Sequence, residues 1–232
     1  LSQCFLQIED EYYAAVRAKS DDSSDERFIT KLLKGGVNFL ELRSLDLNPF
    51  SRIGIDNETT LFLEVFLISS FLQSSEAIDE CERDEIFTND LVVAKKGRKK
   101  DLLLTKKGRK VKLKDWANQI LDEMEPIAEL MGSRNGSDYI GMLNSFRSKA
   151  IDPSETISER LLDNVLVSDK TLEEIAERIG YENKNYYQEI DKNDNNYWDL
   201  FRKEAENSLI KQKDFEDSNQ SFEEYKSLYF KG

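Results

Sequence analysis

Two charged residues, Glu41 and Arg43, stand two positions apart in the mostly apolar segment Phe-Leu-Glu-Leu-Arg-Ser, residues 39–44. Alternation along an extended strand would place both side chains on the same face. An unpaired buried charge is costly, so these two groups must pair with each other, face water or bind a ligand. On spacing alone, a salt bridge within a sheet is the plainer interpretation.

A second group of candidate residues lies in Leu-Gln-Ile-Glu-Asp-Glu-Tyr-Tyr, residues 6–13. In a strand, Glu9, Glu11 and Tyr13 would share one face. Two carboxylates and a tyrosine suit either coordination of a divalent cation or contact with an amino-acid ammonium group. The structural alternative is an edge strand with one face in water.

The sequence contains no histidine and only two cysteines, Cys4 and Cys81. The usual general base, the Ser/His and Cys/His dyads and imidazole-based zinc sites are therefore excluded. The cysteines have no metal-site spacing and form no disulfide framework. Any catalysis would fall to carboxylates, to Lys and Arg, and to a hard metal ion.

A basic segment, residues 95–110, holds nine Lys or Arg residues and two copies of Lys-Lys-Gly-Arg-Lys. Such a segment could bind nucleic acid or another anionic polymer. It contains no aromatic residue for base stacking, and the net charge of the chain is −13. A solvated hairpin is the plainer interpretation, and we expect no nucleic-acid partner.

The elements that would position these residues can be read from hydrophobic periodicity and turn residues. The N-terminal part has strands at residues 5–16 and 37–44 around a helix at 26–33, which Gly35-Gly36 ends. Helices follow at 57–73, beginning at Asp56 or Asn57, and at 75–90. Short strands are expected at 91–93, 102–104 and 111–113. The region from residue 114 onward is helical.

The apolar run of residues 61–72 is too short to span a membrane, so we expect a buried core helix there. No signal-peptide pattern is present, which favours the cytoplasm and free thiols. The chain begins with Leu1 and enters a strand-like segment almost at once, which suggests a fragment of a longer protein.

Residues 41–50, Glu-Leu-Arg-Ser-Leu-Asp-Leu-Asn-Pro-Phe, with Ile-Gly-Ile-Asp at 53–56, resemble the central motif of bacterial-type glutamate–cysteine ligases. Residues 6–19 resemble a second segment of that family, at the same distance before the motif. Ala15, Ala18 and Arg52 stand where the family has prolines. Gly97-Arg98-Lys99 resembles a third family element.

The resemblance implies roles for individual residues. Glu41 matches a carboxylate ligand of an active-site Mg²⁺ (or Mn²⁺), and Arg43 matches a catalytic arginine that neutralises the transferred phosphate. Tyr13 matches a tyrosine of the substrate pocket, where Arg17 and Arg43 would also bind substrate. Glu9 and Glu11 are weaker metal candidates. Asn48, Pro49 and Gly54 are expected to shape a turn.

The resemblance also implies an α+β fold with a glutamine synthetase-like antiparallel active-site sheet. This chain would be the C-terminal half, supplying the last strands and a mostly helical C-terminal region. One catalytic domain would be divided into active-site strands (residues 1–56), core helices with the basic hairpin (57–113) and C-terminal helices (114–232).

The implied activity is the ATP-dependent joining of L-glutamate to L-cysteine, the first step of glutathione synthesis, by a cytoplasmic monomer without a membrane partner. The fragment alone is expected to be inactive. Two alternatives stay open: another carboxylate–amine ligase of the same superfamily, or a non-catalytic module that binds anionic polymers through the basic segment.

Overall fold

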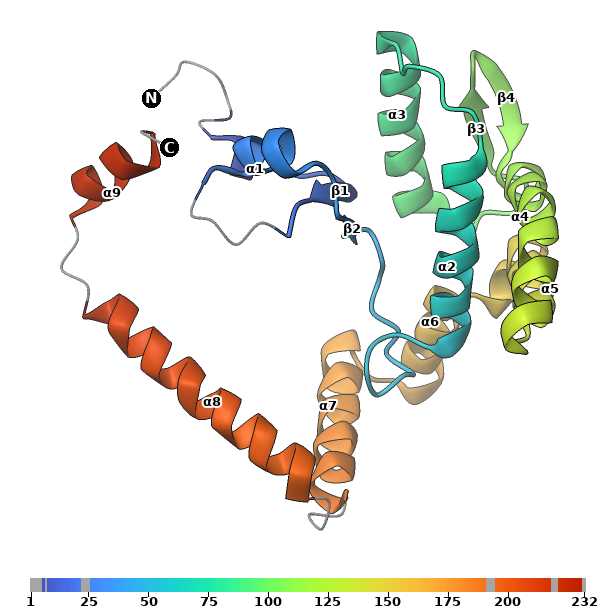
Figure 1. Ribbon diagram of the computed structural model, residues 1–232. Coiled ribbons are helices and arrows are strands. Elements are labelled where there is room, and N and C mark those ends of the chain that lie inside the picture. The colour runs from blue at the N-terminus through green and yellow to red at the C-terminus, as the bar shows by residue number, and fades with distance from the viewer. Residues whose placement is uncertain (1–5, 7, 22–25, 191–194, 218–220, 231–232) are drawn as a thin grey trace. The chain divides into compact units, whose positions relative to one another are not determined.

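A computed structural model of the chain describes residues 6, 8–21, 26–190, 195–217 and 221–230 (Figure 1). These residues belong to two compact units, one made of residues 1–46 and 189–232 and the other of residues 47–188. Helices predominate, and the strands form two antiparallel pairs. This combination agrees with the expected α+β class and with the mostly helical region after residue 113.

The first unit contains the strand pair that carries Glu41. β1 (Val16–Lys19) and β2 (Phe39–Leu42) pair in antiparallel fashion, with Arg17 opposite Glu41. Helix α1 (Phe28–Gly35) lies between the two strands in sequence. It stops at Gly36, whose φ of +72° is a backbone conformation that favours glycine.

The prediction of a strand over residues 5–16 is wrong within the part that the structure describes. Residues Glu9–Glu11 form a short 3₁₀ helix, η1, and the strand starts only at Val16. Consecutive acidic residues have low strand propensity, and β2 offers pairing partners to only the four residues of β1. Alternation of residue types was therefore not enough to make a strand.

Two more helices belong to the first unit. Helices α8 (Asn195–Glu216) and α9 (Phe222–Tyr229) agree with the helical region expected from residue 114 onward. Ser221 and Glu224 form a capping box at the start of α9, in which each side chain accepts a hydrogen bond from the other residue's backbone.

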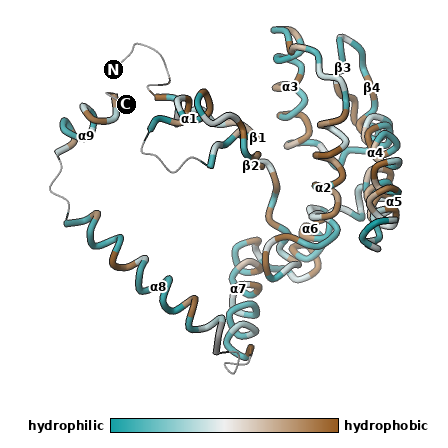
Figure 2. The backbone as a smooth tube through the Cα atoms, in the orientation of Figure 1, coloured by the Kyte–Doolittle hydropathy of each residue, from teal (hydrophilic) through white to brown (hydrophobic). Residues whose placement is uncertain are grey.

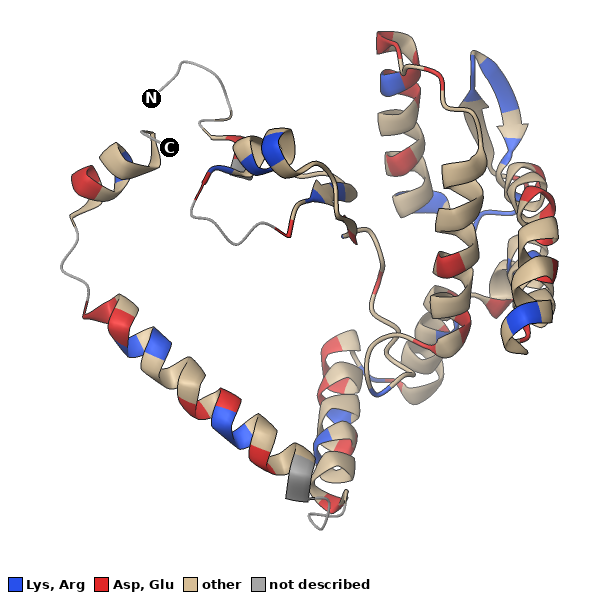
Figure 3. Cartoon of the chain, viewed as in Figure 1, with Lys and Arg blue, Asp and Glu red and all other residues tan. Residues whose placement is uncertain are grey.

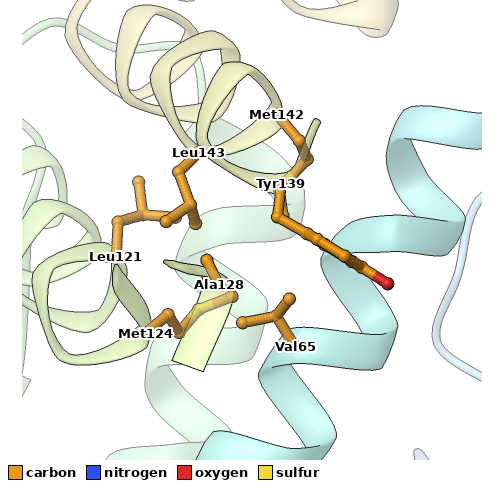
Figure 4. Close-up of a cluster of buried hydrophobic side chains, with 7 residues drawn as sticks. All are labelled: Val65, Leu121, Met124, Ala128, Tyr139, Met142 and Leu143. Atoms are coloured by element: carbon orange, nitrogen blue, oxygen red, sulfur yellow. The ribbon is translucent and has the colours of Figure 1, made fainter. Parts of the chain in front are cut away.

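The second unit has its core where α2 (Asn57–Leu72), α4 (Leu113–Asn135) and α5 (Tyr139–Ile151) meet. Seven buried side chains form this core, and Figure 4 shows them converging from the three helices: Val65, Leu121, Met124, Ala128, Tyr139, Met142 and Leu143. The only strongly polar atom in the cluster, the Tyr139 hydroxyl, donates a hydrogen bond to Glu64 at 2.7 Å.

Helix α2 begins where the sequence predicted, because the Asp56 side chain accepts a hydrogen bond from the Thr59 backbone N–H. Its apolar residues run along most of its length (Figure 2). The prediction of a buried core helix holds for only part of the surface of α2. Val65 is fully buried, but Phe71 is 87% exposed, so only one side of α2 packs into the core.

The basic segment contains one hairpin, made by β3 (Leu103–Lys106) and β4 (Arg109–Lys112). Lys107 and Gly108 both have positive φ, +49° and +75°, as a tight type I′ turn requires. The strand expected at residues 91–93 is instead part of helix α3 (Glu80–Lys96). A run of three apolar residues is compatible with either a strand or a helix. Residues 91–93 are helical because they lie within the seventeen-residue helix α3.

Helix α3 packs its polar side on the hairpin. The Asn89 amide accepts a hydrogen bond from the Thr105 N–H and donates one to the Thr105 carbonyl, at 2.9 and 2.7 Å. Glu85 accepts one from the Gly108 N–H at 2.8 Å. Side chains thus satisfy backbone groups at the edge of a two-stranded sheet, which would otherwise be unpaired.

The remaining helices complete the second unit. They are η2 (Pro153–Glu155), α6 (Ile157–Ser168) and α7 (Leu172–Glu189). Helix α4 stops at Gly136, which has φ +74°. Among the described residues, no helix combines the length and the apolar character that a membrane crossing needs.

Candidate functional site

Glu41 and Arg43 lie together, as their spacing predicted. The Arg43 Nη2 donates a hydrogen bond to the Glu41 Oε2 at 2.9 Å. Lys19 Nζ lies 3.3 Å from that same oxygen. The strand pair positions all three groups, because Lys19 ends β1, Glu41 lies on β2, and the Arg43 N–H donates to the Ala15 carbonyl at 2.8 Å.

The two ion pairs hold this cluster in its charged form. The hydrogen bond from Arg43, with a smaller effect of the one from Lys19, lowers the pKa of the Glu41 carboxyl below its usual range. The same bond to Glu41 raises the pKa of Arg43. One carboxylate therefore faces two cations, and the cluster keeps a net positive charge at neutral pH.

Tyr13 contacts Arg43 in this cluster, and Arg17 contacts Phe28. The Tyr13 hydroxyl donates to the Arg43 backbone carbonyl at 3.2 Å, and the Arg43 guanidinium carbon lies 5.7 Å from the Tyr13 ring centroid. Arg17 stands opposite Glu41 in the sheet, but its guanidinium carbon lies 4.0 Å from the ring centroid of Phe28 on α1.

Glu9 and Glu11 are not on a strand beside β2, because they belong to η1. Glu9 forms an ion pair with Arg27 and accepts a hydrogen bond from the Ile29 N–H at 3.3 Å. In the part of the chain that the structure describes, no three Asp, Glu, Cys or His side chains come close enough together to hold a metal ion. Glu41 could supply one metal ligand, and the other ligands would have to come from outside the described residues.

The region that carries this cluster matches a known family. The family model for glutamate-cysteine ligase matches residues 1–93. The glutamate–cysteine ligase of Alcanivorax borkumensis is 33% identical over 232 residues, which is 99% of this chain and 44% of the relative. That of Shewanella pealeana is 31% identical and is covered to the same 44%.

A solved structure of the glutamate–cysteine ligase of Francisella tularensis, in complex with AMP, superposes with a TM-score of 0.83. The two sequences are 26% identical, and the match covers 97% of this chain and 45% of the other. The chain is thus similar to glutamate–cysteine ligases over nearly its whole length. It spans less than half the length of the relatives it matches.

The turn that follows β2 has a structural role, as the sequence predicted. Asn48 is only 6% exposed and donates to the Asp56 carboxylate at 2.7 Å, while its carbonyl oxygen accepts from the Phe50 N–H at 3.0 Å. Gly54 has φ +77°. These residues shape the turn and cap α2.

Lys and Arg residues cover much of the β3–β4 hairpin (Figure 3), and several of the charges near it are paired. Lys107 pairs with Glu76 at 2.8 Å, and Lys112 and Lys114 both pair with Asp101, at 3.0 and 3.1 Å. Arg98 forms an ion pair with Glu159, on α6. Acidic neighbours thus offset part of the positive charge, which weakens the case for a binding site for anionic polymers.

The site residue that sequence reasoning missed is Lys19. Spacing in the sequence does not predict that Lys19 lies near Glu41, because twenty-two positions and helix α1 separate the two residues. Only the pairing of β1 with β2 brings them together. The one sequence signal that could have found it is the likeness of residues 6–19 to the second family segment.

Proposed function

We propose that the longer protein to which this chain corresponds is an ATP-dependent glutamate–cysteine ligase. The observation that carries the proposal is the cluster of Glu41, Arg43 and Lys19, with Tyr13 on the Arg43 guanidinium, inside the segment that matches the family model. An arginine held on a strand by a carboxylate and an aromatic ring is well placed to bind phosphate.

The reaction would proceed in two transfers. A γ-carboxylate oxygen of glutamate attacks the γ-phosphorus of ATP, the bond from that phosphorus to the bridging oxygen breaks, and ADP leaves. The amine nitrogen of cysteine then attacks the γ-carbon of γ-glutamyl phosphate. The carbon–nitrogen bond forms, the bond from carbon to the phosphate oxygen breaks, and inorganic phosphate and one proton are released.

Each predicted residue has a place in this scheme. Arg43 binds the phosphoryl group, and phosphoryl transfer depends mainly on such positioning and charge neutralisation. Glu41 would be one ligand of Mg²⁺ or Mn²⁺, which supplies further charge neutralisation on the phosphate oxygens. Tyr13 and Arg17 contact substrate. Glu9 and Glu11 stay weaker metal candidates, because Glu9 is already paired with Arg27.

The remaining parts of the proposal concern the whole protein. The β1–β2 pair would be the end of a larger, glutamine synthetase-like sheet, and the chain would be the C-terminal half of one catalytic domain. Within that domain, residues 1–56 would supply active-site strands, 57–113 core helices and hairpin, and 114–232 C-terminal helices. The enzyme would work as a cytoplasmic monomer.

Replacing Glu41 by Gln in the longer protein tests the proposal. We expect phosphate release that depends on glutamate and cysteine to fall by at least about 100-fold, the usual effect of removing one group that stabilises the transition state. The melting temperature should change little, because exposed ion pairs contribute little to stability. Glu76→Gln, at an exposed ion pair on the hairpin, is the matched control.

Full activity of the Glu41→Gln variant would contradict the proposal. A related ligase that uses a different amino-acid acceptor is the second candidate, since the acceptor pocket is not defined by the cluster. Phosphate release measured across a panel of amines separates the two, and the wild-type protein should be fastest with cysteine.

A further inference from the structure

Lys19 and Arg43 share a single acceptor, the Oε2 atom of Glu41. Because both nitrogens lie within 3.3 Å of that oxygen, the two cations are close neighbours. One cation already neutralises one carboxylate, so the second brings repulsion between like charges. Such an arrangement becomes favourable when an anion binds between the two cations.

Stability does not explain the arrangement. The three side chains are partly exposed, at 30% for Lys19, 24% for Arg43 and 38% for Glu41. Ion pairs at such positions stabilise a fold only weakly. Rigid elements nevertheless hold both cations, since Lys19 ends β1, and Arg43 follows β2 and is hydrogen-bonded to Ala15.

Both cations keep hydrogen-bonding capacity. A lysine ammonium has three donors and an arginine guanidinium five. Among the described residues, Glu41 is the only side-chain acceptor for either group. The Tyr13 ring near Arg43 and the Phe28 ring 5.9 Å from Lys19 Nζ offer no strong acceptor. The remaining donors suit the several oxygens of a phosphoryl group.

We propose that Lys19 is a second phosphate-binding residue, which donates with Arg43 to the phosphoryl group that passes from ATP to glutamate. The inference rests on the proposed function for the identity of the phosphate. In the absence of nucleotide, Glu41 holds the two cations in position. When ATP binds, its γ-phosphate oxygens accept from both residues, and no bond to Lys19 is made or broken.

The first test is anion binding by the 232-residue chain. Isothermal titration calorimetry in low salt measures the binding of inorganic tripolyphosphate, which serves as the probe. We expect Lys19→Met to weaken binding about 10-fold or more, since a hydrogen bond to a charged group is lost. Lys19→Arg should restore most of the affinity. Lys34→Met removes an exposed lysine paired with Glu26 and should have no effect.

The basic hairpin could bind the same probe, so the comparison is repeated in a background of Lys107→Gln, Arg109→Gln and Lys110→Gln. The loss of affinity caused by Lys19→Met should persist in that background. Circular dichroism on each variant verifies folding. No binding by the wild-type chain, or equal binding by Lys19→Met, overturns the inference.

Kinetics of the longer protein are the second test. Lys19→Met should lower kcat/KM for ATP about 10- to 100-fold and leave the KM for cysteine unchanged, with recovery in Lys19→Arg. An equal loss in Lys19→Met and Lys19→Arg would mean a structural role and overturn the inference. No turnover by the wild type, together with Lys19-dependent binding of tripolyphosphate, would overturn only the proposed function.

Discussion

At the scale of single residues, the chemistry of this chain is concentrated on one carboxylate and its cations. Glu41 and Arg43 were expected to form either a salt bridge or a ligand site, and the structure shows that the salt bridge exists. The two alternatives are compatible. A salt bridge that leaves a net positive charge, as this one does with Lys19, can also attract an anion.

The pKa of Glu41 gives a prediction at this scale. Arg43 and Lys19 lower that pKa in the folded chain, so its titration followed by NMR should have a midpoint below the usual glutamate range. Because the folded-state pKa is lower than the unfolded one, the stabilisation is complete at neutral pH. It is lost as the pH falls through the folded-state value.

Arg43→Met should move the Glu41 midpoint back toward the usual range, because the largest cause of the shift is removed. Lys34→Met, at an ion pair in the same unit, is the control and should leave it unchanged. A Glu41 midpoint that is the same in the wild type and in Arg43→Met would show that the pair does not persist in solution.

At the scale of secondary-structure elements, the sequence predicted correctly those features that depend on residues a few positions apart, such as helix caps and turns. Asp56 caps α2 as expected, and Thr171 and Glu174 form the reciprocal hydrogen bonds of a capping box before α7. The second turn of the basic segment is a turn because Gly108 has the positive φ that the geometry requires. The first copy of the same motif ends a helix instead.

Two glycines give a matched prediction at this scale. Gly108→Ala should destabilise the chain by about 1 kcal/mol, because alanine is strained at positive φ, although no atom would clash with its Cβ. Gly180→Ala, inside α7 with equally open space, should stabilise it by about 0.4–1 kcal/mol. Urea unfolding monitored by circular dichroism measures both. Changes of the same sign would contradict this assignment of the two backbone conformations.

At the scale of the whole molecule, the chain covers 44% of the Alcanivorax relative. The described residues bring one candidate metal ligand, Glu41, together with the cations of Lys19 and Arg43, and they contain no group of three metal ligands. The large apolar side chain of Phe71 on α2 is also exposed in this chain.

We therefore expect the 232 residues alone to release no phosphate from ATP above the blank, with glutamate, cysteine and Mg²⁺ present. A coupled ADP assay at high protein concentration measures this. The longer protein, prepared in parallel, is the positive control. Turnover by the isolated chain would mean that its own residues complete the site, against the expectation that the fragment is inactive.

The sequence by itself determined the local features: the Glu41–Arg43 spacing, the cap at Asp56, the turn around Asn48 and Gly54, and the helical C-terminal region. Each depends on residues a few positions apart, so composition and periodicity carry the information. The tertiary structure alone decided that Lys19 meets Glu41, that Glu9 pairs with Arg27, and that α3 turns Asn89 toward Thr105. These contacts join segments that are distant in sequence. Strand register and packing decide which residues meet, and local residue patterns do not predict either of them.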